Sequence, residues 1–251
     1  MSIMRTRGSL AATLAVAAVV GSGAMASGAA IYSGNGNTGF GGPLGSGTLS
    51  ISDDVAGNIN FTFNAGGSGN NDYLVVYIDS VSGGFASTSG LNDHADENRR
   101  AISGTNDTDQ SLVTFASGFN ADYALSTPGP GQHSQFAGLW GLATGGPNSL
   151  NYVASANIGG TQNATTFSIT AAELGLTANS GQSFKFVATY LNGGNTYRSD
   201  EAIGNIGITG NPGGPPSSIT FSDSRTYTLV PEPASLGLLA VAGVWGLRRR
   251  R

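Results

Sequence analysis

The chain has 251 residues, of which 40 are glycine, none is cysteine and only 10% are charged. The lack of cysteine excludes disulfides, thiolate metal sites and cysteine nucleophiles. Between Arg7 and Arg248 lie five basic and all 15 acidic residues, a net charge of −10 that disfavours binding to nucleic acid.

The first 30 residues have the pattern of a secretory signal. Two arginines precede an apolar stretch, residues 10–20, and small residues follow it. Ala24 and Ala26 form an A-x-A cleavage site, and a second candidate cut follows Ala30. We therefore expect the secretion machinery to export the chain and signal peptidase to remove residues 1–26. A retained membrane anchor is the alternative.

Short strand patterns recur through the body, which we take as residues 27–230. Asn58–Phe63 alternates apolar and polar residues, and Tyr73–Ile78 is a nearly continuous apolar run typical of a central buried strand. The clearest period-two face comprises Phe184, Phe186, Ala188 and Tyr190. Further strands are predicted at residues 112–116, 121–125, 150–156, 165–169, 219–221 and 226–229.

Helix signals are scarce in this body, because Gly, Ser, Thr and Asn dominate its polar positions. Thr170–Glu173 has the pattern of a capping box that opens one short turn. The Gly- and Asn-rich segment Ser33–Gly47 is predicted to be a loop. The expected fold is all-β, an antiparallel β-sandwich of jelly-roll-like type, with a closed barrel as the alternative.

Two acidic loops are candidate calcium sites, because oxygen ligands clustered in a loop suit Ca²⁺. The first loop contains Asp93, His94 and Asp96, and the second contains Asp107 and Asp109. Neither has the Asp-x-Asp-x-Asp-Gly frame of an EF-hand, so solvated loops without a metal are the preferred interpretation. We therefore expect no cofactor, with Ca²⁺ as the alternative.

The body carries no pattern that marks an enzyme. G-x-S-x-G, the P-loop and the dinucleotide fingerprint are all absent from the sequence. No pair of carboxylates is marked for glycoside hydrolysis. Tyr197 and Trp140 are candidates for stacking on sugar rings, although core or turn positions are the preferred interpretation for both residues. A non-enzymatic protein is the resulting prediction, and a secreted hydrolase is the less favoured alternative.

The C-terminus combines a proline motif, an apolar segment and a basic cluster. Pro231 and Pro233 block a helix before the uncharged run Leu236–Leu247. A helix of these 12 residues spans about 18 Å, so it crosses a thinned bilayer marginally. The positive-inside rule would hold the terminal cluster on the cytoplasmic side of the inner membrane. That cluster consists of Arg248, Arg249, Arg250 and Arg251.

This order of features resembles the PEP-CTERM sorting signal of Gram-negative bacteria, and the resemblance covers Val230–Arg251. It implies that Pro231, Glu232 and Pro233 are the motif recognised by an exosortase-type sorting peptidase, which cuts nearby. It also implies transient anchoring in the inner membrane, followed by a place at the cell surface or in the exopolysaccharide matrix of a biofilm. Residues 231–251 would then be a sorting and membrane-anchor segment.

A second resemblance concerns the body. Asp72–Asp79, with the segment 118–123 downstream, is similar to a pattern of DOMON-like and family-9 carbohydrate-binding domains. That resemblance implies a β-sandwich and sugar binding. The leading prediction is therefore an exported surface or matrix protein associated with exopolysaccharide. A carbohydrate-binding module with a defined sugar site is the alternative.

Overall fold

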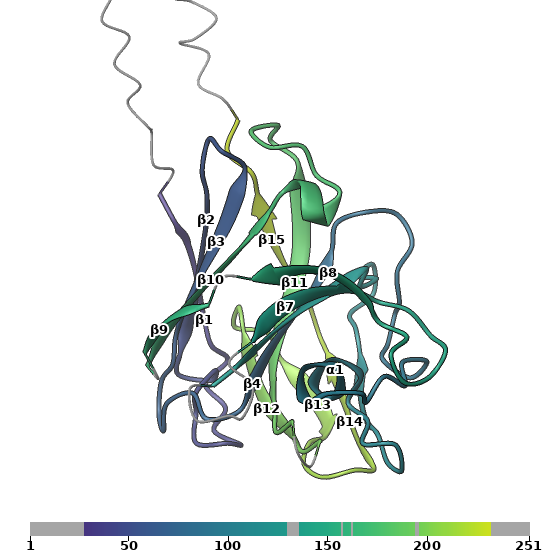
Figure 1. Cartoon of the computed structure of the whole chain (residues 1–251). Coiled ribbons are helices and arrows are strands. Elements are labelled where there is room, and N and C mark those ends of the chain that lie inside the picture. The colour runs from purple at the N-terminus through teal and green to yellow at the C-terminus, as the bar shows by residue number, and fades with distance from the viewer. Residues whose placement is uncertain (1–27, 130–135, 157, 162, 194–195, 232–251) are drawn as a thin grey trace, which may run out of the picture.

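The structure is a computed structural model, and it describes residues 28–129, 136–156, 158–161, 163–193 and 196–231. Most of its regular structure is β, arranged in sheets whose strand pairs are antiparallel with one exception (Figure 1). The all-β prediction is therefore confirmed at the level of fold class. The exception is a parallel pair formed by two strands that lie far apart in the sequence, β5 (Ser111–Thr114) and β14 (Ser217–Phe221).

Two sheets face each other across the main core. Sheet A has the strand order β1 (Ala30–Ser33), β2 (Thr48–Asp53), β3 (Asn58–Asn64), β10 (Ala164–Thr170) and β9 (Gly159–Thr161). Sheet B has the order β12 (Arg198–Ile203), β11 (Ser183–Leu191), β4 (Tyr73–Asp79), β6 (Tyr123–Pro128), β7 (Ala137–Gly141) and β8 (Asn151–Ala156). A further strand, β15 (Arg225–Thr228), pairs with the first half of β11.

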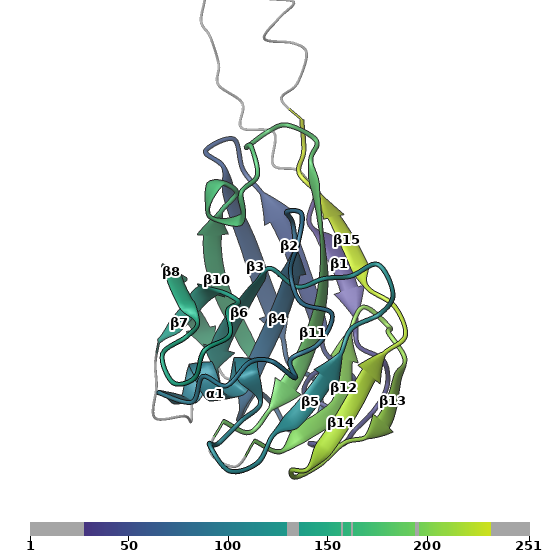
Figure 2. The ribbon, with the colours of Figure 1, turned by 90° about the vertical axis from the view of Figure 1, so that its right-hand side faces the viewer.

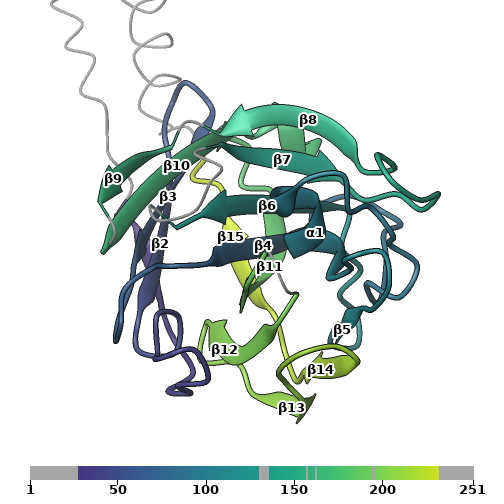
Figure 3. The ribbon, with the colours of Figure 1, turned by 60° about the horizontal axis from the view of Figure 1, so that its bottom comes forward.

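A third layer covers the outer face of sheet B. It contains α1 (Glu97–Ser103) and the three-stranded sheet β13 (Ile208–Asn211), β14 (Ser217–Phe221) and β5 (Ser111–Thr114) (Figure 3). One 3₁₀ turn, Ala172–Leu174, follows β10. Because β4 lies between two layers, its first six residues are buried on both faces, as its unbroken apolar run predicts.

The period-two faces fill the main core. The alternating residues of β3 and those of β11 are buried in one apolar cluster. Phe61 stacks on Phe167 of the neighbouring strand with 5.1 Å between ring centroids. The capping box is also confirmed, because the Thr170 backbone N–H donates to the Glu173 carboxylate at 2.7 Å. These local patterns and the tertiary packing agree, which is what defines the core unambiguously.

One prediction about local structure is wrong, and one strand turns its aromatic residue to the surface. The acidic stretch before Arg99 is not a solvated loop, because it leads into α1, capped by Asp96 at its start and by Gly104 at its end. Tyr152 of β8 does not face the core and is 52% exposed. A register shift between Leu139 and Trp140 interrupts the pairing of β7 with β8, and the ladder ends at that sheet edge.

The long strand β11 defines two poles of the body. Its first residue pairs with Thr228 and its last with Tyr73, so the eight steps between them separate these places by about 27 Å. The proximal pole is the end with Ala30, the β2–β3 turn and Thr228 (Figure 2). The distal pole is the opposite end, where β4 begins and β11 ends. Both ends of the described chain therefore lie at the proximal pole.

The last described residues are tied to the proximal pole by Asp53. Its buried carboxylate accepts hydrogen bonds from the Tyr227 hydroxyl at 2.5 Å and from the Val230 backbone N–H at 3.1 Å. The Pro231 ring lies close to Gly181. Within the described residues, no helix is long and apolar enough to span a membrane. The predicted apolar run 236–247 lies outside those residues.

Candidate functional site

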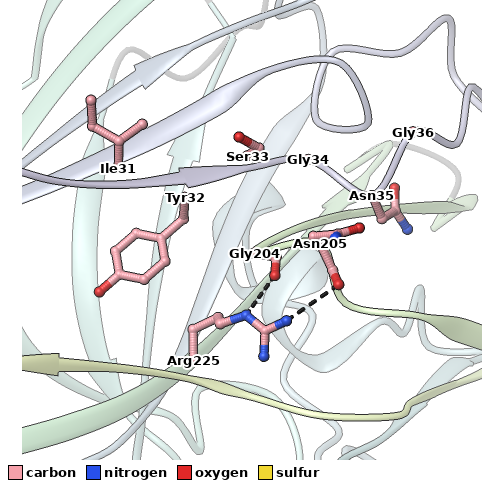
Figure 4. A pocket seen from close by; sticks show the side chains of 9 residues that line it. All are labelled: Ile31, Tyr32, Ser33, Gly34, Asn35, Gly36, Gly204, Asn205 and Arg225. Carbon is pink, nitrogen blue, oxygen red and sulfur yellow. Dashed lines mark hydrogen bonds between the residues drawn. The ribbon is translucent and has the colours of Figure 1, made fainter.

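Two shallow hollows on the surface offer room for a ligand. The first, here called the seam hollow, has a volume of about 540 Å³ and lies where β1 meets the β12–β13 turn and β15 (Figure 4). Its lining comprises Ile31, Tyr32, Ser33, Gly34, Asn35, Gly36, Gly204, Asn205 and Arg225. The second, the distal hollow, has a volume of about 390 Å³ and is lined by Phe40, Asp72, Asn192 and Tyr197 at the distal pole.

The longest polar side chains that line the seam hollow, those of Tyr32 and Arg225, already form hydrogen bonds within the protein. The Arg225 guanidinium donates to the carbonyls of Gly204 and Asn205 (Figure 4) and also to Asp223. The Tyr32 hydroxyl donates to the Thr226 carbonyl at 2.8 Å. The Arg225 bonds therefore tie β15 to the β12–β13 turn, and the Tyr32 bond links sheet A to sheet B. We therefore treat this hollow as structural, although it is the larger of the two.

Tyr197 dominates the distal hollow. Its side chain is 48% exposed, and its hydroxyl makes no hydrogen bond to a described residue. The ring packs so closely against Gly214 that a Cβ added there would lie 2.7 Å from two ring atoms. A side chain at position 214 would therefore displace the Tyr197 ring, so the glycine fixes where the ring lies.

The polar side of the distal hollow is built on Tyr190. This buried tyrosine hydroxyl accepts hydrogen bonds from the backbone N–H groups of Asn71 and Asp72, both at 2.6 Å. The Asn192 amide then donates to the Asp72 carboxylate at 2.8 Å. Partial burial raises the pKa of Asp72 above its ordinary value of 3.8, although the bond from Asn192 opposes this. A carboxylate and an amide are thereby fixed side by side.

The other aromatic residue, Phe40, is carried by the glycine-rich loop, residues 34–47. The buried Glu201 carboxylate organises this loop by accepting four backbone N–H bonds. One oxygen binds Phe40 at 2.7 Å and Gly42 at 3.1 Å, and the other binds Leu44 at 2.8 Å and Gly45 at 3.1 Å. Carboxylate charge at such a nest of N–H groups stabilises an otherwise irregular loop.

The distal hollow has the composition of a sugar site. Aromatic faces bind the apolar C–H face of a sugar ring, while planar amide and carboxylate groups bind its hydroxyls. Asp72 is the one carboxylate among its four lining residues. Glycoside hydrolysis requires two carboxyl groups that face each other across the bond to be cut. The arrangement of these four residues therefore suits binding better than hydrolysis.

The first acidic loop is part of the scaffold. Asp93 is fully buried, and its carboxylate accepts from the backbone N–H groups of Asn148 and Leu150, each at 2.9 Å. Arg99 approaches the same carboxylate at 3.2 Å. Asp96 accepts from the Arg99 backbone N–H at 2.9 Å and so caps α1. Both carboxylates therefore hold chain segments together.

The second acidic loop lies beside the first. Asp107 approaches the His94 ring at 3.4 Å, and this exposed aspartate has a positive φ of 85°. Asp109 accepts from Asn106 through its backbone carbonyl. Among the described residues, no three acidic or histidine side chains gather in a metal-binding group. Calcium dependence accordingly stays a prediction.

Two further sequence candidates occupy structural positions. Trp140 is 2% exposed, which agrees with the preferred interpretation of this residue as part of the core and not with direct stacking on sugar. Asp122, in the second segment of the carbohydrate-domain resemblance, lies just before β6 and accepts from the backbone N–H groups of Ser80 and Val81. This aspartate therefore closes the turn that follows β4.

The residues predicted for export and sorting fall mostly outside the described chain. Pro231 is described and exposed, whereas Glu232, Pro233 and the terminal arginines are not described. Ala24 and Ala26 also lie outside it. Sequence reasoning missed Phe40, Asn192 and Glu201. The sequence signals that bear on Glu201 are the glycine-rich loop, residues 34–47, and the adjacent acids Asp200 and Glu201. Nothing in the sequence indicates that the two lie together.

Known proteins offer no relative of this chain on which a function could be based. No protein-family model matches the chain, and neither the curated proteins nor the solved structures contain a match. Function is therefore inferred from the residues and their arrangement.

Proposed function

We propose that this chain is an exported surface protein of a Gram-negative bacterium that binds neutral polysaccharide at its distal hollow. An exosortase-type peptidase would sort it through Pro231, Glu232 and Pro233. The signal helix, the apolar sorting helix and the jelly-roll-like description of the sandwich belong to the same proposal. The protein performs no chemistry of its own in this account.

The arrangement of the poles supports this proposal. Both ends of the described chain lie at the proximal pole, where Asp53 holds Val230 just before the proline motif. A body attached there would direct its distal pole away from the membrane. The distal hollow then meets the extracellular matrix, whereas a site at the proximal pole would face the lipid surface.

One observation carries the binding function. Tyr197 holds its ring on Gly214, nearly half exposed, beside Phe40 and the bonded pair of Asp72 and Asn192. Binding sites for small ligands combine aromatic side chains with a few fixed polar groups, which is the combination that these four residues present. The net charge of −10 favours a neutral ligand over an anionic one. This is the defined sugar site that the sequence left as its alternative.

Native gels that contain a polysaccharide test the proposal, because a bound protein migrates more slowly through them. The full chain, in a detergent without a sugar head group, would be run through dextran, laminarin and hydroxyethylcellulose, with alginate as the anionic control. We expect one neutral polysaccharide to retard the wild type and Tyr197→Ala to abolish most of that retardation. Val55→Ala removes an equally exposed apolar group at the proximal pole and serves as the matched control. Equal retardation of wild type and Tyr197→Ala would refute the site.

A further inference from the structure

A second cluster of aromatic rings lies at the β8 edge of sheet B. Phe136 and Tyr152 are 40% and 52% exposed, with 6.1 Å between their ring centroids. The buried Trp140 contacts both rings edge to face, at 6.1 and 6.2 Å. Arg99 in turn lies 5.9 Å from the centre of the Trp140 ring. A rigid buried tryptophan therefore supports two rings at the surface.

The exposed aromatic residues of this protein are concentrated at two places. Among the residues that the structure describes, three aromatic side chains are exposed: Phe136, Tyr152 and Tyr197. Tyr197 lies in the distal hollow, and the other two form the cluster at β8. The same argument applies to both surfaces, because at each of them exposed aromatic rings lie beside side chains that form hydrogen bonds.

The chemistry around the cluster favours a neutral, hydroxyl-rich ligand. β8 has the sequence NYVASA, which carries no charge. The Tyr152 hydroxyl shares a 2.8 Å hydrogen bond with the Ser155 hydroxyl, and both groups are exposed. Asn151, also exposed, begins the same strand. Ring faces beside hydroxyl and amide groups are the combination already present in the distal hollow.

A second copy of the chain is the competing occupant, because β8 is an edge strand. The register shift between Leu139 and Trp140 works against it, since bulges twist an edge away from strand pairing. The exposed face of β8 carries the amide of Asn151 and the hydroxyls of Tyr152 and Ser155, with Val153, 37% exposed, as an apolar neighbour, and this mixture suits a hydroxyl-rich ligand. We propose that Phe136 and Tyr152 form a second contact surface for neutral polysaccharide.

Two separated surfaces make the molecule bivalent. In sheet B, four strand-to-strand steps lead from β11, which carries the distal hollow, to β8. At about 4.8 Å a step, the two surfaces lie about 19 Å apart across the sheet. A single protein could then hold two polysaccharide chains, or two places on one chain, and gain affinity by avidity. This inference rests on the proposed function for its ligand class but not for its residues.

The test compares a double variant, Phe136→Ala with Tyr152→Ala, against Tyr197→Ala in the same affinity gels and in turbidity measurements. We expect about a tenfold weaker apparent affinity in either variant, and loss of polysaccharide clustering in both. Tyr152→Phe keeps the ring, so it should retain at least half of the retardation. Circular dichroism and thermal unfolding confirm that each variant is folded, and Val55→Ala is the control.

The outcomes separate the two claims. Normal retardation and clustering by the double variant, with Tyr197→Ala impaired, would overturn the second surface alone. Impairment of the double variant with a normal Tyr197→Ala would support the second surface and overturn the distal hollow. A wild-type dimer that the double variant converts into a monomer would assign the cluster to a second copy of the chain. No retardation of the wild type by any neutral polysaccharide would overturn both claims.

Discussion

Glu201 provides a direct test of how the distal hollow is built. Its two carboxylate oxygens each accept two backbone N–H bonds from the glycine-rich loop. Glu201→Gln keeps the size of the side chain but replaces one oxygen by an NH₂ group. That group cannot accept, so two of the four N–H donors lose their partner. The perturbation is therefore electronic rather than steric.

The expected cost follows from those two bonds. Hydrogen bonds to a charged group contribute roughly 1.5–3 kcal/mol each, so the loss lies between about 3 and 6 kcal/mol. The loop is partly exposed, and water would satisfy some of the released N–H groups. We therefore expect a decrease near the lower end, about 3 kcal/mol in the free energy of unfolding. Phe40 would also move, because its N–H is one of the four donors.

Urea unfolding followed by circular dichroism measures this change. Asp200→Asn is the matched control, because the neighbouring aspartate is only half-buried and its carboxylate accepts one hydrogen bond, from the Gly39 backbone N–H at 3.1 Å. Its replacement should cost about 0.5 kcal/mol or less. If Glu201→Gln unfolds within 1 kcal/mol of the wild type, the carboxylate does not organise the loop and the reasoning is wrong.

Three other predictions concern the proximal pole, the acidity of the site and the tail. Asp53→Ala removes an acceptor from the buried Tyr227 hydroxyl and from the part-buried Val230 N–H, so we expect about 1–3 kcal/mol lower stability and faster proteolysis after Tyr227. The raised pKa of Asp72 places its protonation above pH 3.8, so sugar binding should weaken as the pH falls through that raised value. A pKa raised by folding means that the free energy of unfolding decreases as the pH rises and Asp72 becomes ionised. Asp72→Asn should therefore be at least as stable as the wild type at pH 7, as measured by thermal unfolding. Replacing Glu232 and both flanking prolines by alanine should leave uncleaved chain in the inner-membrane fraction, and normal cleavage of that variant would refute the motif.

The elements that could be predicted from sequence are those in which local pattern and tertiary environment agree. β3 and β11 alternate cleanly because one face packs on the core, and β4 is continuously apolar because both faces are covered. α1 was missed because its polar sequence, ENRRAIS, gives little helical periodicity. Its start and end depend on Asp96 and Gly104, whose roles become visible only in three dimensions.

The candidate site was predictable in part. Tyr197 could be selected as an aromatic residue in a polar, turn-rich segment, and its exposure agrees with that prediction. Phe40 and Asn192 are more than 150 positions apart in the sequence, so no local pattern joins them. Neighbouring residues of a strand face opposite sides of its sheet, and Asp200 and Glu201 differ accordingly: the first is half-buried and the second is fully buried. The partner loop of Glu201 could not be inferred from that alternation.

The central claim is that neutral sugar binds at the distal hollow, and an NMR titration tests it most directly. The ¹⁵N-labelled full chain would be titrated with oligosaccharides released from the polysaccharide that retards it. We predict shifts of the amide signals of Gly42, Asp72 and Tyr197, with the signals around Asp53 unchanged. Shifts confined to the seam hollow, at Gly204 and Asn205, or no shifts at saturating sugar, would contradict the account.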